Sequence, residues 1–238
     1  MKTFDPILTI GDMVTQRPHL SRVFEKFGID YCCGGGKTLP EACAEQELDP
    51  DTVWQALEAT QSTSVSEADY STMSMTELAD HIETIHHVYL RQELPRLERM
   101  AQKVAKVHGQ NHPETRELVH VFVGLRMELE KHMIKEEQVL FPAIRQMEGE
   151  EQAVHFPFGT LANPIRMMEQ EHDNAGNALG RIRELTRDFL PPDDACNTYR
   201  ALFDGLRELE LDMHQHIHKE NNVLFPRAME MEDRKGAT

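Results

Sequence analysis

The feature that most constrains this chain is an 11-residue motif that occurs twice. Residues 132–142 read HMIKEEQVLFP, and residues 216–226 read HIHKENNVLFP. Positions i and i+4 lie one above the other on an α-helix, so each copy presents a histidine and a glutamate on one face. A buried carboxylate needs a partner for its charge, and a second acidic copy cannot supply one. The repeat therefore predicts a metal ion between the pairs His132/Glu136 and His216/Glu220.

Composition excludes several classes of function. The chain has 238 residues, 39% of them hydrophobic, so it can bury a core, but its formal charge of −16 argues against nucleic acid and anionic membranes. No apolar run approaches the length of a membrane-spanning helix, and the N-terminal sequence lacks a signal-peptide pattern. Four cysteines, two of them adjacent, suit a reducing compartment. We therefore expect a cytoplasmic protein.

The pattern along the chain is helical almost throughout and predicts an all-α fold. Residues 1–60 form a small helical domain with short helices after Thr38 and Asp49, where T-L-P-E and D-P are helix-start signals. The polar, Ser/Thr-rich residues 61–74 predict a linker. Residues 75–232 predict an antiparallel up-down four-helix bundle. Its helices are expected at about 75–107, 114–147, 160–189 and 195–231.

Prolines fall late in two of these helices. Pro142 and Pro226 should each kink or end its helix, because proline lacks the backbone N–H that continues the hydrogen-bond ladder. Pro95 should kink the first helix.

The repeat extends beyond the 11-residue motif, because a histidine precedes each copy at a similar distance. His172 precedes His216 by 44 positions, and His87 precedes His132 by 45. Each half is then a helical hairpin with one histidine on its first helix and an H-x-x-x-E pair on its second. The neighbouring His86 could take the place of His87 after a 100° rotation of the helix, and spacing alone leaves both open.

Four histidines and two glutamates suit a pair of metal ions. Imidazole and carboxylate are ligands for iron, manganese or zinc, and six are too many for one tetrahedral site. Two histidines per ion, with both glutamates bridging, fit better. A ferritin-type site would use the Glu-x-x-His spacings 83/86 and 169/172, but it also needs lone glutamates where this chain has H-x-x-x-E. A purely structural bundle would have to bury six polar side chains without a metal.

Three acidic residues are candidates to support the ligands. Glu128 and Asp212 lie one turn before His132 and His216, and Glu171 adjoins His172. They could orient an imidazole or carry protons, or they could be a charged helix edge. His214 and His218 are two positions from His216 and so fall on the opposite face of the helix, where we expect solvent.

The adjacent cysteines Cys32 and Cys33 precede a glycine-rich turn and a helix N-terminus. Such thiols could have lowered pKa values and be reactive, or they could be two small packed residues. Spacing leaves both interpretations open. The nearby Gly36-Lys37-Thr38 resembles the end of a phosphate-binding loop, but position 31 is tyrosine rather than glycine and no strand precedes it, so we expect no nucleotide site.

Over nearly its whole length the chain resembles the repair of iron centres (RIC) family of di-iron proteins, of the YtfE/ScdA type. The segment DYCCGGG resembles the ScdA-like N-terminal domain, and four segments resemble its hemerythrin-like bundle: HHVYLRQELPRL, HMIKEEQVLFP, MEQEHDNAG and HIHKENNVLFP. The stretch EGEEQAVHFPFG departs from the family as a longer connection between helices two and three. The resemblance implies an oxo-bridged centre of two iron ions per chain and selects His87 over His86. The implied ligands are His87, His132, Glu136, His172, His216 and Glu220, with Cys32 and Cys33 as candidates for redox or transfer.

The resemblance also implies a function. The family is associated with repair of iron-sulfur clusters damaged by oxidative or nitrosative stress, by donation of iron, and with reduction of nitric oxide. Its partners would be proteins with damaged clusters and the small ligands nitric oxide or dioxygen, and a homodimer is compatible with it. The alternative is a hemerythrin-like oxygen carrier or sensor. That architecture usually has five histidines and two carboxylates, with an H-x-x-x-H pair on one helix. This chain lacks such a pair at the expected place and has Glu136 and Glu220 instead.

Overall fold

The computed structural model describes residues 8–60, 70 and 72–236. Within those residues every regular element is helical, and β-type pairing is confined to the isolated bridges Thr9–Thr38 and Phe156–Gly159. The expected all-α class is thus confirmed. Most of the linker expected at 61–74 lies outside the described residues. None of the described helices combines the length and apolar character needed to cross a membrane.

Contacts divide the chain into two compact units that do not follow its linear order. One contains residues 81–143 and 156–213, and the other contains residues 1–80, 144–155 and 214–238. The boundary at residue 213 falls inside a continuous helix, α10, which spans Asn197–Lys219.

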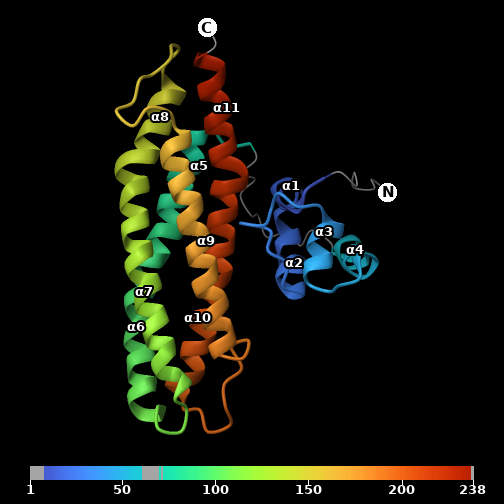
Figure 1. Ribbon diagram of the computed structural model, residues 1–238, viewed down its shortest axis with the longest axis vertical. Helices are drawn as coiled ribbons and strands as arrows, with labels where there is room; N and C mark the ends of the chain where they lie inside the picture. The colour runs from blue at the N-terminus through green and yellow to red at the C-terminus, as the bar shows by residue number, and fades with distance from the viewer. Residues whose placement is uncertain (1–7, 61–69, 71, 237–238) are drawn as a thin grey trace. The chain divides into compact units, whose positions relative to one another are not determined.

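The first of these units is built from four long helices that run side by side (Figure 1). They are α6 (Val88–His108), α7 (Glu114–Lys135), α9 (Ala162–Leu185) and α10. Short connections between α6 and α7 and between α9 and α10 make neighbouring helices antiparallel, as expected for an up-down bundle. Predicted and observed helices agree closely, apart from the breaks described next.

Three of the predicted long helices contain one π-helical turn each. These turns are η2 (Glu83–His87), η3 (Glu136–Leu140) and η4 (Glu220–Leu224). The helices resume as α8 (Phe141–Gly149) and α11 (Phe225–Gly236), so Pro142 and Pro226 do not end them. We attribute this to the wider π turn that precedes each proline and leaves room for its ring.

The other unit contains the N-terminal helices. These are α1 (Ile10–Gln16), the 3₁₀ turn η1 (Pro18–Leu20), α2 (Ser21–Phe27), α3 (Leu39–Glu45), α4 (Pro50–Ala59) and most of α5 (Met75–Ile82). The start signals work as predicted: Thr38 and Glu41 form a capping box, and Asp49 caps α4. Helix α2 ends at Gly28, whose φ of 67° is left-handed and suits glycine. A buried core that includes Phe24 and Val53 holds these short helices together.

The N-terminal helices contact one face of the end of α10 and η4. The His218 ring, 1% exposed, lies edge-on to the Tyr31 ring at 5.5 Å and donates from Nδ1 to the Tyr31 carbonyl at 3.3 Å. Burial lowers the pKa of His218 to about 4, so the ring is neutral near pH 7. The expectation that His218 is solvated was wrong. It faces away from His216 as predicted, but a segment almost 200 residues earlier in the chain covers it.

Asn222 makes the tightest of these contacts. Its Nδ2 donates to the Cys32 carbonyl at 2.9 Å, and its Oδ1 lies where a side chain on Gly11 or Gly35 would have to fit. A Cβ at Gly35 would stand 2.5 Å from that oxygen and 2.6 Å from the Tyr31 carbonyl. Both distances are too short for real contacts.

We therefore expect Gly35→Ala to destabilise this unit by about 1–3 kcal/mol through overpacking. Trp54 in α4 is the single tryptophan of the chain, so denaturation followed by its fluorescence reports on these helices. Gly36→Ala is the matched control, because a Cβ there meets nothing within 4 Å. Equal stabilities for the two variants would contradict the packing described here.

Candidate metal centre

The ligand candidates occupy positions that the bundle otherwise fills with apolar side chains. In α7 the buried stripe runs Leu118, Phe122, Leu125, Leu129 and then His132, at alternating spacings of four and three. That spacing keeps successive residues on one face of a helix. In the same way His172 follows Ile165 and Met168 in α9. Sequence periodicity thus directs these polar groups to the core.

All six side chains that the sequence selected are buried. Their exposed fractions are 0–2%, for His87, His132, Glu136, His172, His216 and Glu220. Three of them lie in a π turn: His87 ends η2, Glu136 begins η3, and Glu220 begins η4. Single π turns are frequent at functional sites, because the extra residue re-aims neighbouring side chains.

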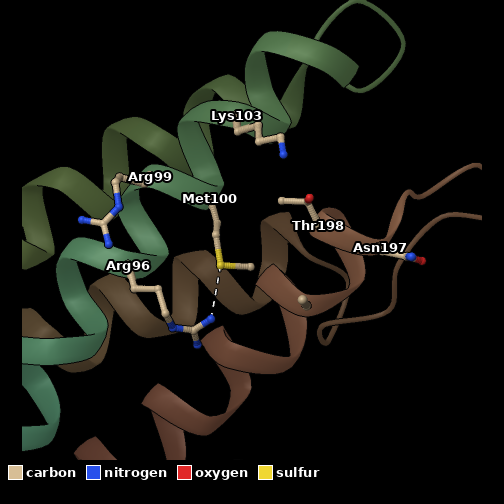
Figure 2. A pocket seen from close by; sticks show the side chains of 7 residues that line it. Arg96, Arg99, Met100, Lys103, Asn197 and Thr198 are labelled. Atoms are coloured by element: carbon tan, nitrogen blue, oxygen red, sulfur yellow. Dashed lines mark hydrogen bonds between the residues drawn. The ribbon is translucent and has the colours of Figure 1, made fainter.

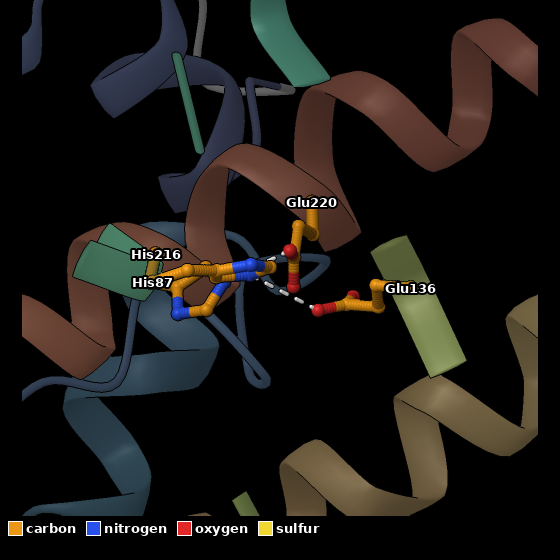
Figure 3. Close-up of side chains that lie close together, drawn as sticks. All are labelled: His87, Glu136, His216 and Glu220. Atoms are coloured by element: carbon orange, nitrogen blue, oxygen red, sulfur yellow. Dashed lines mark hydrogen bonds and ion pairs between the residues drawn. The ribbon is translucent and has the colours of Figure 1, made fainter. Parts of the chain in front are cut away.

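The six residues form two groups with shared members. His87, Glu136, His216 and Glu220 offer one ligand atom each within 4.8 Å of one another, and Figure 3 shows their side chains converging. His132, Glu136, His172 and Glu220 form the second group under the same limit. Both carboxylates therefore belong to both groups, the arrangement that the bridging prediction requires.

The chemistry of this donor set fits cations. Nε2 of His132 and Nε2 of His172 lie 3.1 Å apart, and Nε2 of His132 and of His87 each lie 3.3 Å from Oε2 of Glu136. Nε2 of His216 lies 2.9 Å from Oε1 of Glu220. Metal ions bind imidazole and carboxylate at about 2.0–2.2 Å, so ligand atoms spaced like these can share an ion. The buried negative charge gives such an ion an electrostatic reason to bind.

The neighbouring histidines His86 and His87 have different partners. His87 joins the first group, whereas Nδ1 of His86 lies 2.9 Å from Oδ1 of Asp212. The His87 ring also stacks on Phe141, with ring centroids 5.9 Å apart and planes 14° apart. The geometry therefore favours His87, in agreement with the family resemblance.

Two carboxylates outside the ligand groups accept hydrogen bonds from the rings of His87 and His132. His87 donates from Nδ1 to Oε1 of Glu137 at 2.7 Å, and His132 donates from Nδ1 to Oε2 of Glu171 at 2.9 Å. With Nδ1 as the donor, Nε2 presents its lone pair to the centre. The hydrogen bond from His132, followed by one from Lys135, lowers the pKa of Glu171 to about 2, so it is ionised near neutral pH. Hydrogen bonds from Arg91 and His87 also lower the pKa of Glu137, although burial alone would raise it.

The predicted supporting residues have different outcomes. Glu171 contacts His132 rather than the adjacent His172. Asp212 contacts His86, which no spacing rule indicated, and Glu128 is exposed to solvent. The exposure of Glu128 fits the alternative interpretation, a charged helix edge. Glu137 was missed, and its only sequence signal is its place after Glu136 in K-E-E.

We expect Glu171→Ala to weaken metal binding by about 10–100-fold, because the His132 ring loses its orienting acceptor. Competition with a chelator, followed by metal analysis, measures this affinity. Glu128→Ala removes an exposed carboxylate from α7, four residues before His132, and should leave affinity unchanged. The assignment of Glu171 is contradicted if the two variants behave alike.

The two N-terminal motifs, the apparent phosphate loop and the cysteine pair, have the following contacts. Thr38 of the apparent phosphate loop caps α3, and Lys37 pairs with Glu45 at 2.6 Å. The pKa of the Cys32 thiol is raised, first by its hydrogen bond with Cys33 and then by burial and Asp30. The lowered pKa that the sequence allowed is therefore absent at Cys32.

An open pocket on the long-helix unit contains none of the six candidate ligands. It has a volume of about 480 Å³ and is lined by residues of α6 and α10, among them Arg96, Arg99 and Lys103 (Figure 2). Arg96 already pairs with Glu93 at 2.5 Å.

Comparison with known proteins gives two family matches. The model for the hemerythrin HHE cation-binding domain matches residues 78–228, and ScdA_N, described as a domain of unknown function, matches residues 8–61. Proteins named iron-sulfur cluster repair protein YtfE are similar over 220 residues, which is 92% of this chain and 96% of theirs. The identity is 40% for the protein from Enterobacter sp. (strain 638) and 39% for those from Citrobacter koseri and Escherichia coli O1:K1.

Proposed function

Because the chain belongs to the repair of iron centres family, of the YtfE/ScdA type, we propose that it repairs iron-sulfur clusters damaged by oxidative or nitrosative stress. The proposed cofactor is a pair of iron ions, and the proposed mode of action is donation of iron to the damaged protein. Its partners are then iron-sulfur proteins, and its place of action is the cytoplasm.

The observation that carries this proposal is the sharing of Glu136 and Glu220 by both ligand groups. Shared carboxylates favour two adjacent ions over two independent sites. They also make the centre more anionic than a set of neutral imidazoles, which favours oxidised iron and ion exchange over reversible binding of oxygen. Each group has four protein ligands, which leaves coordination positions for a small molecule or an incoming ligand.

Nitric oxide reduction at the same centre is the finer part of the proposal. A pair of ferrous ions, when bound, supplies the two electrons that convert two molecules of nitric oxide and two protons into nitrous oxide and water. The contribution of the chain is to hold the site dry and fixed. His87 and His132 stay oriented by Glu137 and Glu171, and ring stacking on Phe141 limits rotation of His87.

The test is iron transfer under anaerobic conditions. We expect about two irons per chain after reconstitution with ferrous iron, and loss of that iron to an iron-sulfur protein whose cluster was damaged, with recovery of the acceptor's activity. The His132→Ala/Glu136→Ala variant is the metal-deficient control. Free ferrous iron, added at the same concentration together with a chelator, controls for simple release into solution.

Two results would count against the proposal. A stable, reversible oxygen adduct without iron transfer would favour the hemerythrin-like carrier instead. Acceptor repair by the metal-deficient variant at the rate of the unaltered protein would show that the centre is not the source of iron.

A further inference from the structure

The loop between α2 and α3 folds around one carboxylate. Oδ1 of Asp30 accepts from the backbone N–H of Cys32 at 2.9 Å and of Cys33 at 3.0 Å, and Oδ2 accepts from that of Gly34 at 3.0 Å. The Cys32 thiol also donates to Oδ1, at 3.0 Å. The carboxylate therefore fixes the backbone of both cysteines and touches one of their sulfurs.

Residues outside the loop form hydrogen bonds with its backbone and hold it in place. The Gly35 carbonyl accepts from the N–H of Gly11 at 2.8 Å, and the Cys32 carbonyl accepts from Asn222 Nδ2 at 2.9 Å. A Cβ on Gly34 would stand 2.8 Å from the Asp30 carbonyl, so the chain passes too closely there for any other residue. Fixed ligand positions lower the cost of binding an ion.

A disulfide is a poor use of this cysteine pair. Neighbouring Cα atoms lie about 3.8 Å apart, whereas a relaxed disulfide prefers about 4.4–6.8 Å. Both thiols are free, Cys32 buried and Cys33 half-buried, and the peptide bonds of the described residues are all trans. Two sulfurs that cannot comfortably join each other can still both reach one ion.

The loop meets the geometric requirement for such an ion. Asp30, Cys32 and Cys33 each offer a ligand atom, and all three atoms lie within 4.8 Å of one another. Asp30 is exposed and Cys33 is half-buried, so two of the three ligand residues are in contact with solvent. Two thiolates with one carboxylate form a mixed soft and hard donor set, which suits borderline divalent ions and does not suit calcium or magnesium.

We infer that Asp30, Cys32 and Cys33 form a second metal site, for a single borderline divalent transition-metal ion such as zinc or ferrous iron. Binding replaces the two thiol protons: M²⁺ joins two sulfurs and the Asp30 carboxylate, and two protons pass to solvent. The fourth position of a tetrahedral ion stays open to water or to a donor on another molecule. This site shares no ligand with the histidine and glutamate groups and stands independently of the proposed repair function.

The experiment is a titration of the full chain with Co²⁺ alone. Cobalt bound by thiolate gives a near-ultraviolet charge-transfer band that imidazole and carboxylate ligands do not give, so the band reports this site even when cobalt also enters the bundle. We expect a band that saturates at one cobalt per chain and slowed alkylation of Cys33. Cys33→Ser should abolish the band, and Asp30→Asn should weaken the affinity by roughly tenfold or more.

The controls separate this site from other thiols and from misfolding. Cys196→Ser removes an exposed cysteine elsewhere and should keep the band in full. Trp54 fluorescence verifies that the serine and asparagine variants retain the folded N-terminal helices. The inference is overturned if folded, unaltered protein gives no thiolate band, if the band persists in Cys33→Ser, or if it disappears in Cys196→Ser.

Discussion

The His132→Ala/Glu136→Ala variant is expected to lose nearly all of the iron that the unaltered protein retains after anaerobic reconstitution. Glu136 belongs to both ligand groups, so its removal takes one ligand from each. Removal of His132 takes a second ligand from the group that contains His172. The effect should exceed the roughly 10–100-fold loss of affinity that follows removal of a supporting residue. Metal analysis after gel filtration measures the iron that remains bound.

The chain offers a control of the same composition on the same helix. His120 and Glu128 are exposed residues of α7, and their joint replacement by alanine removes one histidine and one glutamate without entering the core. This variant should retain its iron. Iron that survives the His132→Ala/Glu136→Ala change would mean that the ligand assignment is wrong.

Phe141→Ala is expected to cost about 3–5 kcal/mol of unfolding free energy, the usual range for truncating a fully buried phenylalanine. Phe141 is 0% exposed and its ring stacks on that of His87. The variant should therefore also hold metal less tightly per folded molecule, because His87 gains room to rotate. Chemical denaturation of the metal-free protein gives the first quantity, and chelator competition gives the second.

Phe122→Ala distinguishes packing from ligand support. Phe122 is equally buried in α7 but precedes His132 by ten residues, or about 15 Å along the helix. It should lose a similar amount of stability and keep its metal affinity. Phe141→Leu, which preserves most of the volume, supplies a folded protein if the alanine variant is too unstable. If Phe141→Ala, Phe141→Leu and Phe122→Ala all bind metal with equal affinity, Phe141 does not position His87.

Part of the candidate site followed from the sequence because it depends on local geometry. The spacing of His132 from Glu136, and of His216 from Glu220, is fixed once each segment is a helix, and the apolar stripe of α7 turns the first pair inward. The all-α class and the capped starts of α3 and α4 followed from equally local signals. The choice between His86 and His87 did not, because one residue changes the direction by only 100° on a helix.

The π turns show what local reasoning left undecided. Pro142 and Pro226 were predicted to kink or end their helices; each follows a π turn, and neither proline ends its helix, which resumes as α8 or α11. An acidic residue six positions before proline is the pattern that could have suggested it, since Glu136 and Glu220 each open such a turn.

By itself, the sequence determined which residue types face the bundle core and at what intervals, because helical periodicity needs only neighbours in the chain. Tertiary structure alone decided which partners those residues meet. Glu171 reaches His132 from another helix, and Asn222 and the Cys32 carbonyl are 190 positions apart. Contacts of that kind depend on how separate helices rotate and pack, which no spacing rule within one helix can fix.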